Sequence, residues 1–180
     1  MSRDRARRTL PGMFTVHTAT SAPAGSRDAL AALERNVGFI PNLAGVIAGS
    51  PVALNGFVGM QSALRGSRLT ALEREVVGLT VSRVNDCAYS LAAHSRFAAA
   101  AGASEGLLAA VRDGASLEDE RLERLRAFTE DVLAERGHVA AAFDAEETLE
   151  VLTQIAYTTL ANFAADVSGA PVDDAFRALV

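Results

Sequence analysis

Residues 70–94, TALEREVVGLTVSRVNDCAYSLAAH, predict two helices separated by a short break. Thr70 and Glu73 have the spacing of a capping box, in which each side chain accepts a hydrogen bond from the other residue's backbone N–H. The box marks the start of the first helix. The Asn85-Asp86 pair breaks that helix and offers an N-cap for the second, which is expected to start at Cys87. A break this short folds the two helices back against each other as an antiparallel pair.

The rest of the chain also has the spacing of amphipathic helices. Apolar residues recur three or four positions apart, and prolines, N-capping residues and glycines punctuate them. Helices are expected over residues 26–37, 41–48, 51–65, 70–84, 87–102, 104–112, 117–135 and 144–167, with a short one from 173. Only residues 13–17 have a weak strand-like alternation. Because no linker divides the sequence, we predict one all-α domain of antiparallel helix pairs over residues 13–180, after a disordered tail of residues 1–12.

The composition excludes several classes of function. Hydrophobic residues make up 49% of the 180 residues and the net charge is −5. With no long apolar run and no basic stripe, neither a membrane nor a nucleic acid is an expected partner. All 17 basic residues are arginines, which rules out Schiff-base chemistry on a lysine. The single cysteine rules out an intramolecular disulfide, and with no secretory signal we expect a cytoplasmic protein.

Three residues of the second helix that carry chemistry fall on one face. At about 100° per residue, Ser90 and His94 lie within about 60° of Cys87 around the helix. Ser90 is expected to neighbour both, whereas Cys87 and His94 lie two turns, or about 10 Å, apart along the axis. That separation disfavours a shared metal ion, so no metal site is predicted. No cofactor is expected either. Across the antiparallel pair, the carboxylate of Glu75 is expected to approach His94, orient its ring and raise its basicity.

Cys87 is a candidate reactive thiol in its own right. It lies at a helix N-terminus, whose partial positive charge favours a thiolate, and Ser90 or a water would bridge it to His94. On the helix before it, Gly78 and Ser82 are small and leave room for another helix or a cavity beside Glu75. A lone cysteine on an alanine-rich helix is also commonly a small buried hydrophobe. The spacing alone therefore leaves both a functional and a structural interpretation open.

Further motifs bring a known family into view. Gly38-Phe39-Ile40-Pro41-Asn42-Leu43 and Ser50-Pro51 precede the central stretch, in which Glu75, Cys87 and His94 fit a Glu…Cys-x-x-Cys-x-x-x-His pattern. On these residues the sequence resembles the carboxymuconolactone decarboxylase and alkylhydroperoxidase (AhpD-like) superfamily, particularly its peroxidase-related branch, over most of residues 26–175. The resemblance implies an AhpD-like helical bundle that assembles into dimers, trimers or hexamers.

The resemblance also implies roles for the site residues. Redox-active members use two cysteines with a histidine and a glutamate as a proton relay, and a partner thiol system resets their disulfide. Glu75, Cys87 and His94 match that pattern, and Tyr89 stands between the two cysteine positions. Ser90 occupies the place of the second cysteine, so no intrahelical disulfide can form. A one-cysteine cycle through a sulfenic acid, reduced by an external thiol, remains open.

Three functions follow from these observations. The leading hypothesis is a hydroperoxide-reducing thiol oxidoreductase in which Cys87 reacts, Glu75 and His94 relay protons, Ser90 bridges them and Tyr89 lines the substrate pocket. The second is a non-redox decarboxylase-like enzyme in which His94 is the acid or base and Cys87 is incidental. The third is a catalytically degenerate oligomeric binding protein. The expected partners are a small hydroperoxide or carboxylate, an external thiol reductant and other copies of the chain.

Overall fold

The computed structural model describes residues 12–177, which form nine α-helices and no strand. The all-helical prediction is confirmed, and residues 13–17 form no strand. The predicted disordered tail lies, except for its last residue, outside the described residues. None of the helices in the described part has the length and hydropathy that crossing a membrane requires. The helices are α1 (Ala24–Val37), α2 (Asn42–Ile47), α3 (Pro51–Leu64), α4 (Ala71–Val84), α5 (Ala88–Ala100), α6 (Glu105–Asp113), α7 (Glu120–Ala134), α8 (Ala145–Ser168) and α9 (Asp174–Arg177).

Local signals in the sequence account for most helix ends. The Thr70–Glu73 capping box is present: the Thr70 N–H donates to Glu73 Oε2 over 2.7 Å, and the Glu73 N–H donates to Thr70 Oγ1 over 3.2 Å. Helix α7 starts three residues later than the predicted start at residue 117, because the carboxylate of Asp119 caps it by accepting from two backbone N–H groups. These caps fix where α4 and α7 begin, and so where their side chains face.

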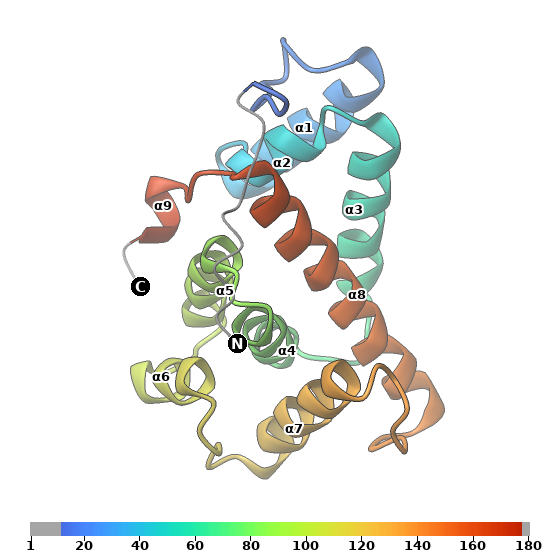
Figure 1. Cartoon of the computed structure of the whole chain (residues 1–180), viewed down its shortest axis with the longest axis vertical. Coiled ribbons are helices and arrows are strands. Elements are labelled where there is room, and N and C mark those ends of the chain that lie inside the picture. Colours follow the sequence, from blue (N-terminus) through green and yellow to red (C-terminus); the bar gives the residue numbers. More distant parts are fainter. Residues whose placement is uncertain (1–11, 178–180) are drawn as a thin grey trace, which may run out of the picture.

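Two apolar cores lie along the molecule, and α5 and α8 contribute to both. The first core is built by α1, α2, α3, the start of α5, the C-terminal half of α8 and α9. The second is built by α4, the end of α5, α6, α7 and the N-terminal half of α8. In Figure 1, α8 runs along much of the length of the molecule, between α2 at one end and α7 at the other. The middle of α5 therefore lies where the two cores meet.

The turn between α4 and α5 is the local feature that positions the site. Asp86 adopts a φ of 54°, in the left-handed region, and the Cys87 N–H donates to the Ser82 carbonyl over 3.0 Å. Cys87 is itself the extended N-cap residue, so α5 begins at Ala88 rather than at Cys87 as predicted. The turn folds α5 back against α4 as an antiparallel pair, as the sequence indicated.

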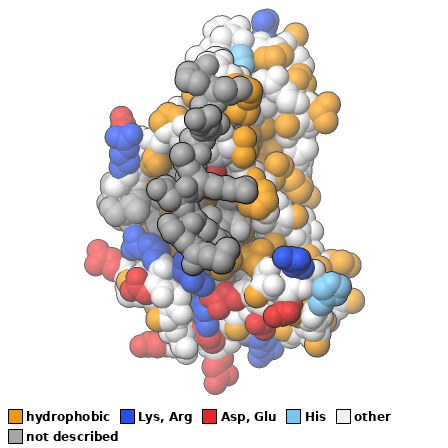
Figure 2. Space-filling view, viewed as in Figure 1, with side chains coloured by type: hydrophobic (Ala, Val, Ile, Leu, Met, Phe, Trp, Pro, Cys, Tyr) orange, Lys and Arg blue, Asp and Glu red, His pale blue; other side chains and the backbone are white. Residues whose placement is uncertain are grey.

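One face of the molecule has an apolar and a charged region. Figure 2 shows hydrophobic side chains gathered over the region of α3 and α8, whereas charged side chains gather around α6 and α7. The exposed apolar side chains include Val52 of α3 and Leu160, Phe163 and Val167 of α8. Contiguous exposed apolar surface of this kind is typical of a contact with another protein chain.

Candidate active site

His94 and Glu75 form a hydrogen-bonded pair between α5 and α4. His94 Nδ1 lies 2.6 Å from Glu75 Oε2, so the predicted approach of the two side chains is confirmed. A carboxylate at Nδ1 favours the forms of the ring in which Nδ1 carries a hydrogen. The other ring nitrogen, Nε2, is then the one left to exchange a proton with a bound molecule.

Gly78 makes room for the His94 ring. A Cβ built on Gly78 would fall 2.5 Å, 2.6 Å and 2.9 Å from the ring atoms Cε1, Nδ1 and Nε2 of His94. The imidazole therefore lies directly against the backbone of α4, where any side chain would displace it. The small residue on this strip of α4 leaves room beside Glu75, as the sequence predicted, and the room is filled by His94.

Two adjoining cavities meet at His94. The outer cavity has a volume of about 390 Å³ and is lined by Glu75 together with polar side chains such as Arg65, Arg74 and Gln154. The inner chamber has a volume of about 70 Å³ and is mainly apolar. Five side chains line both cavities, which therefore adjoin: Val37, Gln61, His94, Phe97 and Tyr157. The imidazole thus borders both a larger cavity of mixed polarity and a smaller, mainly apolar one.

Ser90 lies in the wall of the inner chamber. Its side chain is buried, and it lines the chamber together with His94. The sequence prediction that Ser90 and His94 share a face is confirmed, and that face is the one turned to the chamber. Position 90 is therefore the position of the Cys-x-x-Ser motif that a bound molecule would meet.

Cys87 lies away from both cavities. Its side chain is fully buried, it is not among the residues that line either cavity, and its Sγ donates to the Asn162 carbonyl over 3.7 Å. Burial raises the pKa of the thiol; the N–H and hydroxyl of Ser90 oppose that effect, and Asp166 adds to it. The expectation that the helix N-terminus favours a thiolate is thus corrected: the pKa of the thiol is raised, chiefly by burial, which favours the protonated form.

A buried polar network explains why Cys87 sits where it does. Asn162 of α8 donates to Ser82 Oγ over 3.2 Å and accepts from Asn85 Nδ2 over 2.9 Å. Ser82 in turn donates to the Gly78 carbonyl over 2.7 Å. The network joins α8 to α4 and to the turn before α5, and Cys87 is packed against it. Cys87 is therefore held in a buried, hydrogen-bonded environment between α4, α5 and α8.

Tyr89 supports the inner chamber from behind rather than lining it. Its hydroxyl donates to Asp173 Oδ2 over 2.6 Å and accepts from the Leu43 N–H over 3.2 Å. Burial raises the pKa of this phenol, and the hydrogen bond to Asp173 raises it further. The predicted pocket residue is therefore a buried support that ties α5 to α2 and to the segment before α9.

Tyr157 of α8 is a site residue that the sequence did not indicate. Its ring stacks on Phe57 with a centroid distance of 4.7 Å, and its hydroxyl accepts from Gln61 Nε2 over 3.3 Å. Burial raises the pKa of Tyr157, with a further contribution from the Glu75 carboxylate, so the hydroxyl stays protonated. Because it accepts from Gln61, its own hydrogen is left to donate to a molecule in the cavities. No local motif marks Tyr157, since its neighbours come from α3.

No group of three or more histidine, cysteine, aspartate or glutamate side chains within residues 12–177 is arranged as a metal site. The chemical groups that the structure assembles are instead an imidazole with its carboxylate, a phenol and a serine hydroxyl around two cavities. Such a set can move protons and donate hydrogen bonds to a bound molecule.

Comparisons with known proteins relate one segment of the sequence to a family and the whole fold to solved structures. The model of the carboxymuconolactone decarboxylase family matches residues 51–131, a segment that contains Glu75, Cys87 and His94. No curated protein sequence matches the chain significantly. A structure of the alkylhydroperoxidase AhpD core, from an uncharacterized peroxidase-related protein of Ralstonia eutropha JMP134, superposes with a TM-score of 0.79 and 21% identity, covering 91% of this chain and 93% of that one.

Two further structures share the fold. An uncharacterized peroxidase-related protein from Silicibacter sp. TM1040 has a TM-score of 0.78 and 18% identity, covering 99% of this chain and 98% of that one. A variant of the debrominase Bmp8 in complex with 2,3,4-tribromopyrrole has a TM-score of 0.77 and 15% identity, covering 95% and 97%. The chain is thus similar to the carboxymuconolactone decarboxylase family over residues 51–131, and it shares the fold of AhpD-like proteins over most of its length.

Proposed function

We propose that this protein is an acid–base enzyme of the carboxymuconolactone decarboxylase and alkylhydroperoxidase superfamily, in which His94 exchanges a proton with a small substrate and Glu75 orients the imidazole. One observation carries the proposal: His94 lines both cavities, whereas Cys87 is fully buried and lines neither. A positioned histidine that transfers a proton in the transition state contributes about 10²–10⁴-fold to a rate. The second hypothesis from the sequence, with Cys87 incidental, is therefore preferred to the thiol-based one.

The reaction class that fits these groups is decarboxylation of a small activated carboxylate. The bond between the carboxylate and its carbon breaks, CO₂ leaves, and the electron pair of that bond passes to the neighbouring carbonyl system. Protonated His94 then gives its Nε2 proton to the carbon that lost CO₂. The Tyr157 hydroxyl would hydrogen-bond the oxygen that gains charge, and neutral His94 would recover a proton from water.

The lining of the cavities supports a carboxylate substrate with a small apolar part. Arg65 and Arg74 line the outer cavity, and guanidinium groups are well suited to carboxylates. The inner chamber offers mainly apolar contacts beside His94. The debrominase of similar fold was crystallised with a small brominated aromatic ring, so we include aromatic acids among the substrates to be tested.

Hydroperoxide reduction through Cys87 is the second candidate, because the N–H and hydroxyl of Ser90 favour the thiolate against burial. The thiolate would attack a peroxide oxygen, an S–O bond would form as the O–O bond breaks, and the alcohol would leave with a proton from His94. Two external thiol groups would then reduce the sulfenic acid to the thiol, releasing water and forming their own disulfide. This route requires Cys87 to become accessible from its buried position.

Two matched variants separate the candidates. Turnover is measured by CO₂ release from unsaturated lactone acids and aromatic acids, and by hydroperoxide consumption in the presence of an external dithiol. The acid–base proposal predicts that His94→Ala lowers decarboxylation at least 100-fold, whereas Cys87→Ala stays within a few-fold of the unaltered protein. Loss of all activity in Cys87→Ala, with peroxide as the substrate consumed, would contradict it and favour the second candidate.

The partners of the protein are part of the same proposal. The exposed apolar side chains on α3 and α8 support assembly with other copies of the chain, which we propose as its state in the cytoplasm. Sedimentation of the purified protein tests this: a monomer at micromolar concentration would contradict the assembly. A degenerate binding protein, the third hypothesis from the sequence, would bind small acids in the cavities without turning them over.

A further inference from the structure

One of the aromatic side chains that line the inner chamber, Phe176, comes from the C-terminal helix α9. Phe176 of α9 is buried and lines the chamber together with His94, Ser90 and Phe97. Its ring lies 5.5 Å from Phe97 and 5.6 Å from Phe39, between ring centroids. Phe176 lines the inner chamber but not the outer cavity, so it bounds the apolar recess alone.

The segment that carries Phe176 is attached to the rest of the fold by several hydrogen bonds, most of them to the carboxylate of Asp173. Helix α9 has four residues, too few for a helix to be stable by itself. Asp173, directly before α9, accepts from the Tyr89 hydroxyl over 2.6 Å and from the Asn42 N–H over 3.0 Å and 3.2 Å to its two oxygens. Asn42 also donates from its side chain to the Pro171 carbonyl over 3.0 Å. These bonds attach the segment that carries Phe176 to α2 and α5.

The volume of the chamber limits the size of the apolar group that can lie beside Phe176. The chamber measures about 70 Å³, whereas an apolar cavity of about 150 Å³ is known to accept benzene or xenon. A substrate whose reacting atom lies at His94 can therefore place only a small apolar group in the recess. Removing the ring of Phe176 would enlarge the recess without touching His94, Glu75 or Tyr157.

We propose that Phe176 sets the upper size of the apolar group that fits beside His94, and that Asp173 is the positioning residue that holds Phe176 in place. The inference rests on the proposed function only in placing the reacting atoms of the substrate at His94. It adds a specificity-determining residue from a part of the chain, α9, that lies outside the matched family segment.

The test measures binding of benzene and xenon, and so does not depend on turnover. Binding is followed by methyl NMR of Leu33 and Leu43, which line the chamber. Phe176→Ala should bind benzene at least tenfold more tightly than the unaltered protein, with a small change for xenon, and Phe176→Leu should lie between. Phe163→Ala removes an exposed ring on α8 that lines neither cavity, and should leave both affinities unchanged. Equal benzene affinity in Phe176→Ala, Phe176→Leu and the unaltered protein would overturn the proposal.

The positioning role has its own readout. Asp173→Asn and Tyr89→Phe each weaken the same hydrogen bond, so each should raise the ratio of benzene to xenon affinity, and the double variant should raise it no further. A lowered unfolding midpoint with an unchanged ratio would contradict the role of Asp173. If the Phe176 variants change benzene affinity but His94→Ala has no effect on turnover, the proposed function fails and the role of Phe176 stands. If benzene affinity is unchanged in the Phe176 variants but the rate depends on His94, the role of Phe176 fails and the proposed function stands.

Discussion

Glu73 and Glu75 stand two residues apart in the first turns of α4, and the structure gives them different roles. Residues two apart on a helix point to different faces. Glu73 accepts from the Thr70 N–H over 2.7 Å and from Arg121 Nε over 2.7 Å, so its oxygens are satisfied within a buried cluster. Glu75 accepts from His94 and lines the outer cavity. The same side chain thus serves the fold on one face and the site on the other.

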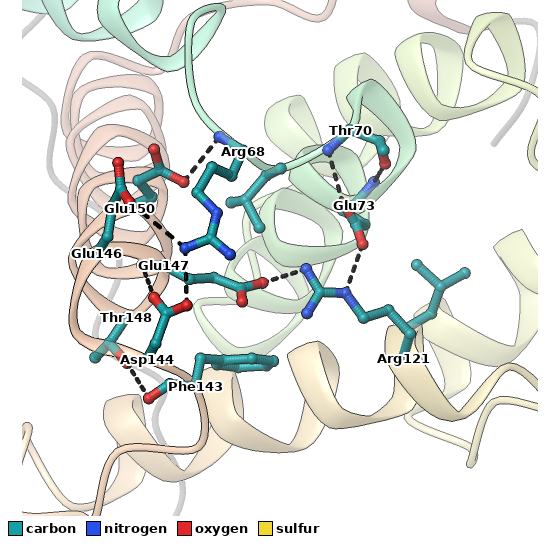
Figure 3. A network of polar contacts seen from close by, with 12 residues as sticks. Arg68, Thr70, Glu73, Arg121, Phe143, Asp144, Glu146, Glu147, Thr148 and Glu150 are labelled. Atoms are coloured by element: carbon teal, nitrogen blue, oxygen red, sulfur yellow. Dashed lines mark hydrogen bonds and ion pairs between the residues drawn. The ribbon is translucent and has the colours of Figure 1, made fainter.

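The cluster around Glu73 is a closed ion-pair network. Arg121 of α7 bridges Glu73 of α4 and Glu147 of α8, and its guanidinium lies 5.3 Å from the centroid of the Phe143 ring. Figure 3 shows Arg121 between the two carboxylates, with Arg68 joined to Asp144 nearby. Burial raises the pKa of Glu73, but the hydrogen bonds from Arg121 and Thr70 outweigh burial and leave it lowered. A network that is satisfied in this way stabilises the fold and leaves nothing to react.

The largest expected effect is the loss of turnover on replacing His94. His94→Ala removes the proton-transferring group and should lower turnover by about 10²–10⁴-fold. Arg121→Ala, which breaks the other pair, should leave turnover per folded molecule unchanged. Steady-state rates of both variants check this, with the folded fraction measured by circular dichroism. Similar rate losses in the two variants would show that the Glu75–His94 pair matters no more to the reaction than the ion pairs of Arg121.

The second effect tests how the imidazole is placed. Gly78→Ala puts a Cβ within 3 Å of the His94 ring, and a misplaced catalytic group costs up to about 10²-fold in rate. Gly56→Ala is the matched control on α3, because a Cβ there meets no atom within 4 Å. The control should keep its rate and gain stability, by about 0.5–1 kcal/mol, since alanine is the better helix former. A normal rate in Gly78→Ala would mean that the position of the ring is not critical.

The third effect concerns the closed network. Arg121→Gln leaves the buried carboxylates of Glu73 and Glu147 without their shared partner, which should lower the free energy of unfolding by about 1–2 kcal/mol. The value lies toward the low end because Arg121 is itself partly exposed. Urea unfolding measures it. Arg68→Gln is the control: its pair with Asp144 is about half exposed, so a smaller loss is expected.

The smallest effect is a pH dependence of stability that the network confers. The folded pKa of Glu73 is lowered, so its contribution is present above the unfolded pKa of about 4.3 and is lost as pH falls through the folded value. Urea midpoints at pH 6 and pH 3 should therefore differ less in Glu73→Gln than in the unaltered protein. Identical pH dependence in both proteins would show that Glu73 does not contribute to the pH dependence of stability.

Parts of the fold and the site follow from local sequence. The capping box at Thr70 and the break at Asp86 depend on neighbouring residues, so they could be read from the chain. The same break makes α4 and α5 antiparallel, which is why the contact of Glu75 with His94 was predictable. Gly78 likewise lies on the strip that faces α5.

The remainder depends on helices that are distant in the chain. Cys87 was expected to be activated because a helix N-terminus is a local feature, but its burial comes from Asn162 of α8, 75 residues away. Tyr89 was expected in the pocket, but its hydroxyl bonds to Asp173, 84 residues away. Tyr157 and Phe176 reach the cavities from α8 and α9, and nothing in their own surroundings in the sequence marks them.

The most direct test of the proposed function asks whether His94 or Cys87 is accessible from the cavities. The native protein is treated in one sample with diethyl pyrocarbonate, which modifies accessible histidines, and in another with iodoacetamide, which alkylates accessible thiols; peptides are then mapped by mass spectrometry. His94 is expected to be modified in the folded protein, whereas Cys87 is expected to be alkylated only after unfolding. Rapid alkylation of Cys87 in the native protein, with His94 left unmodified, would contradict it.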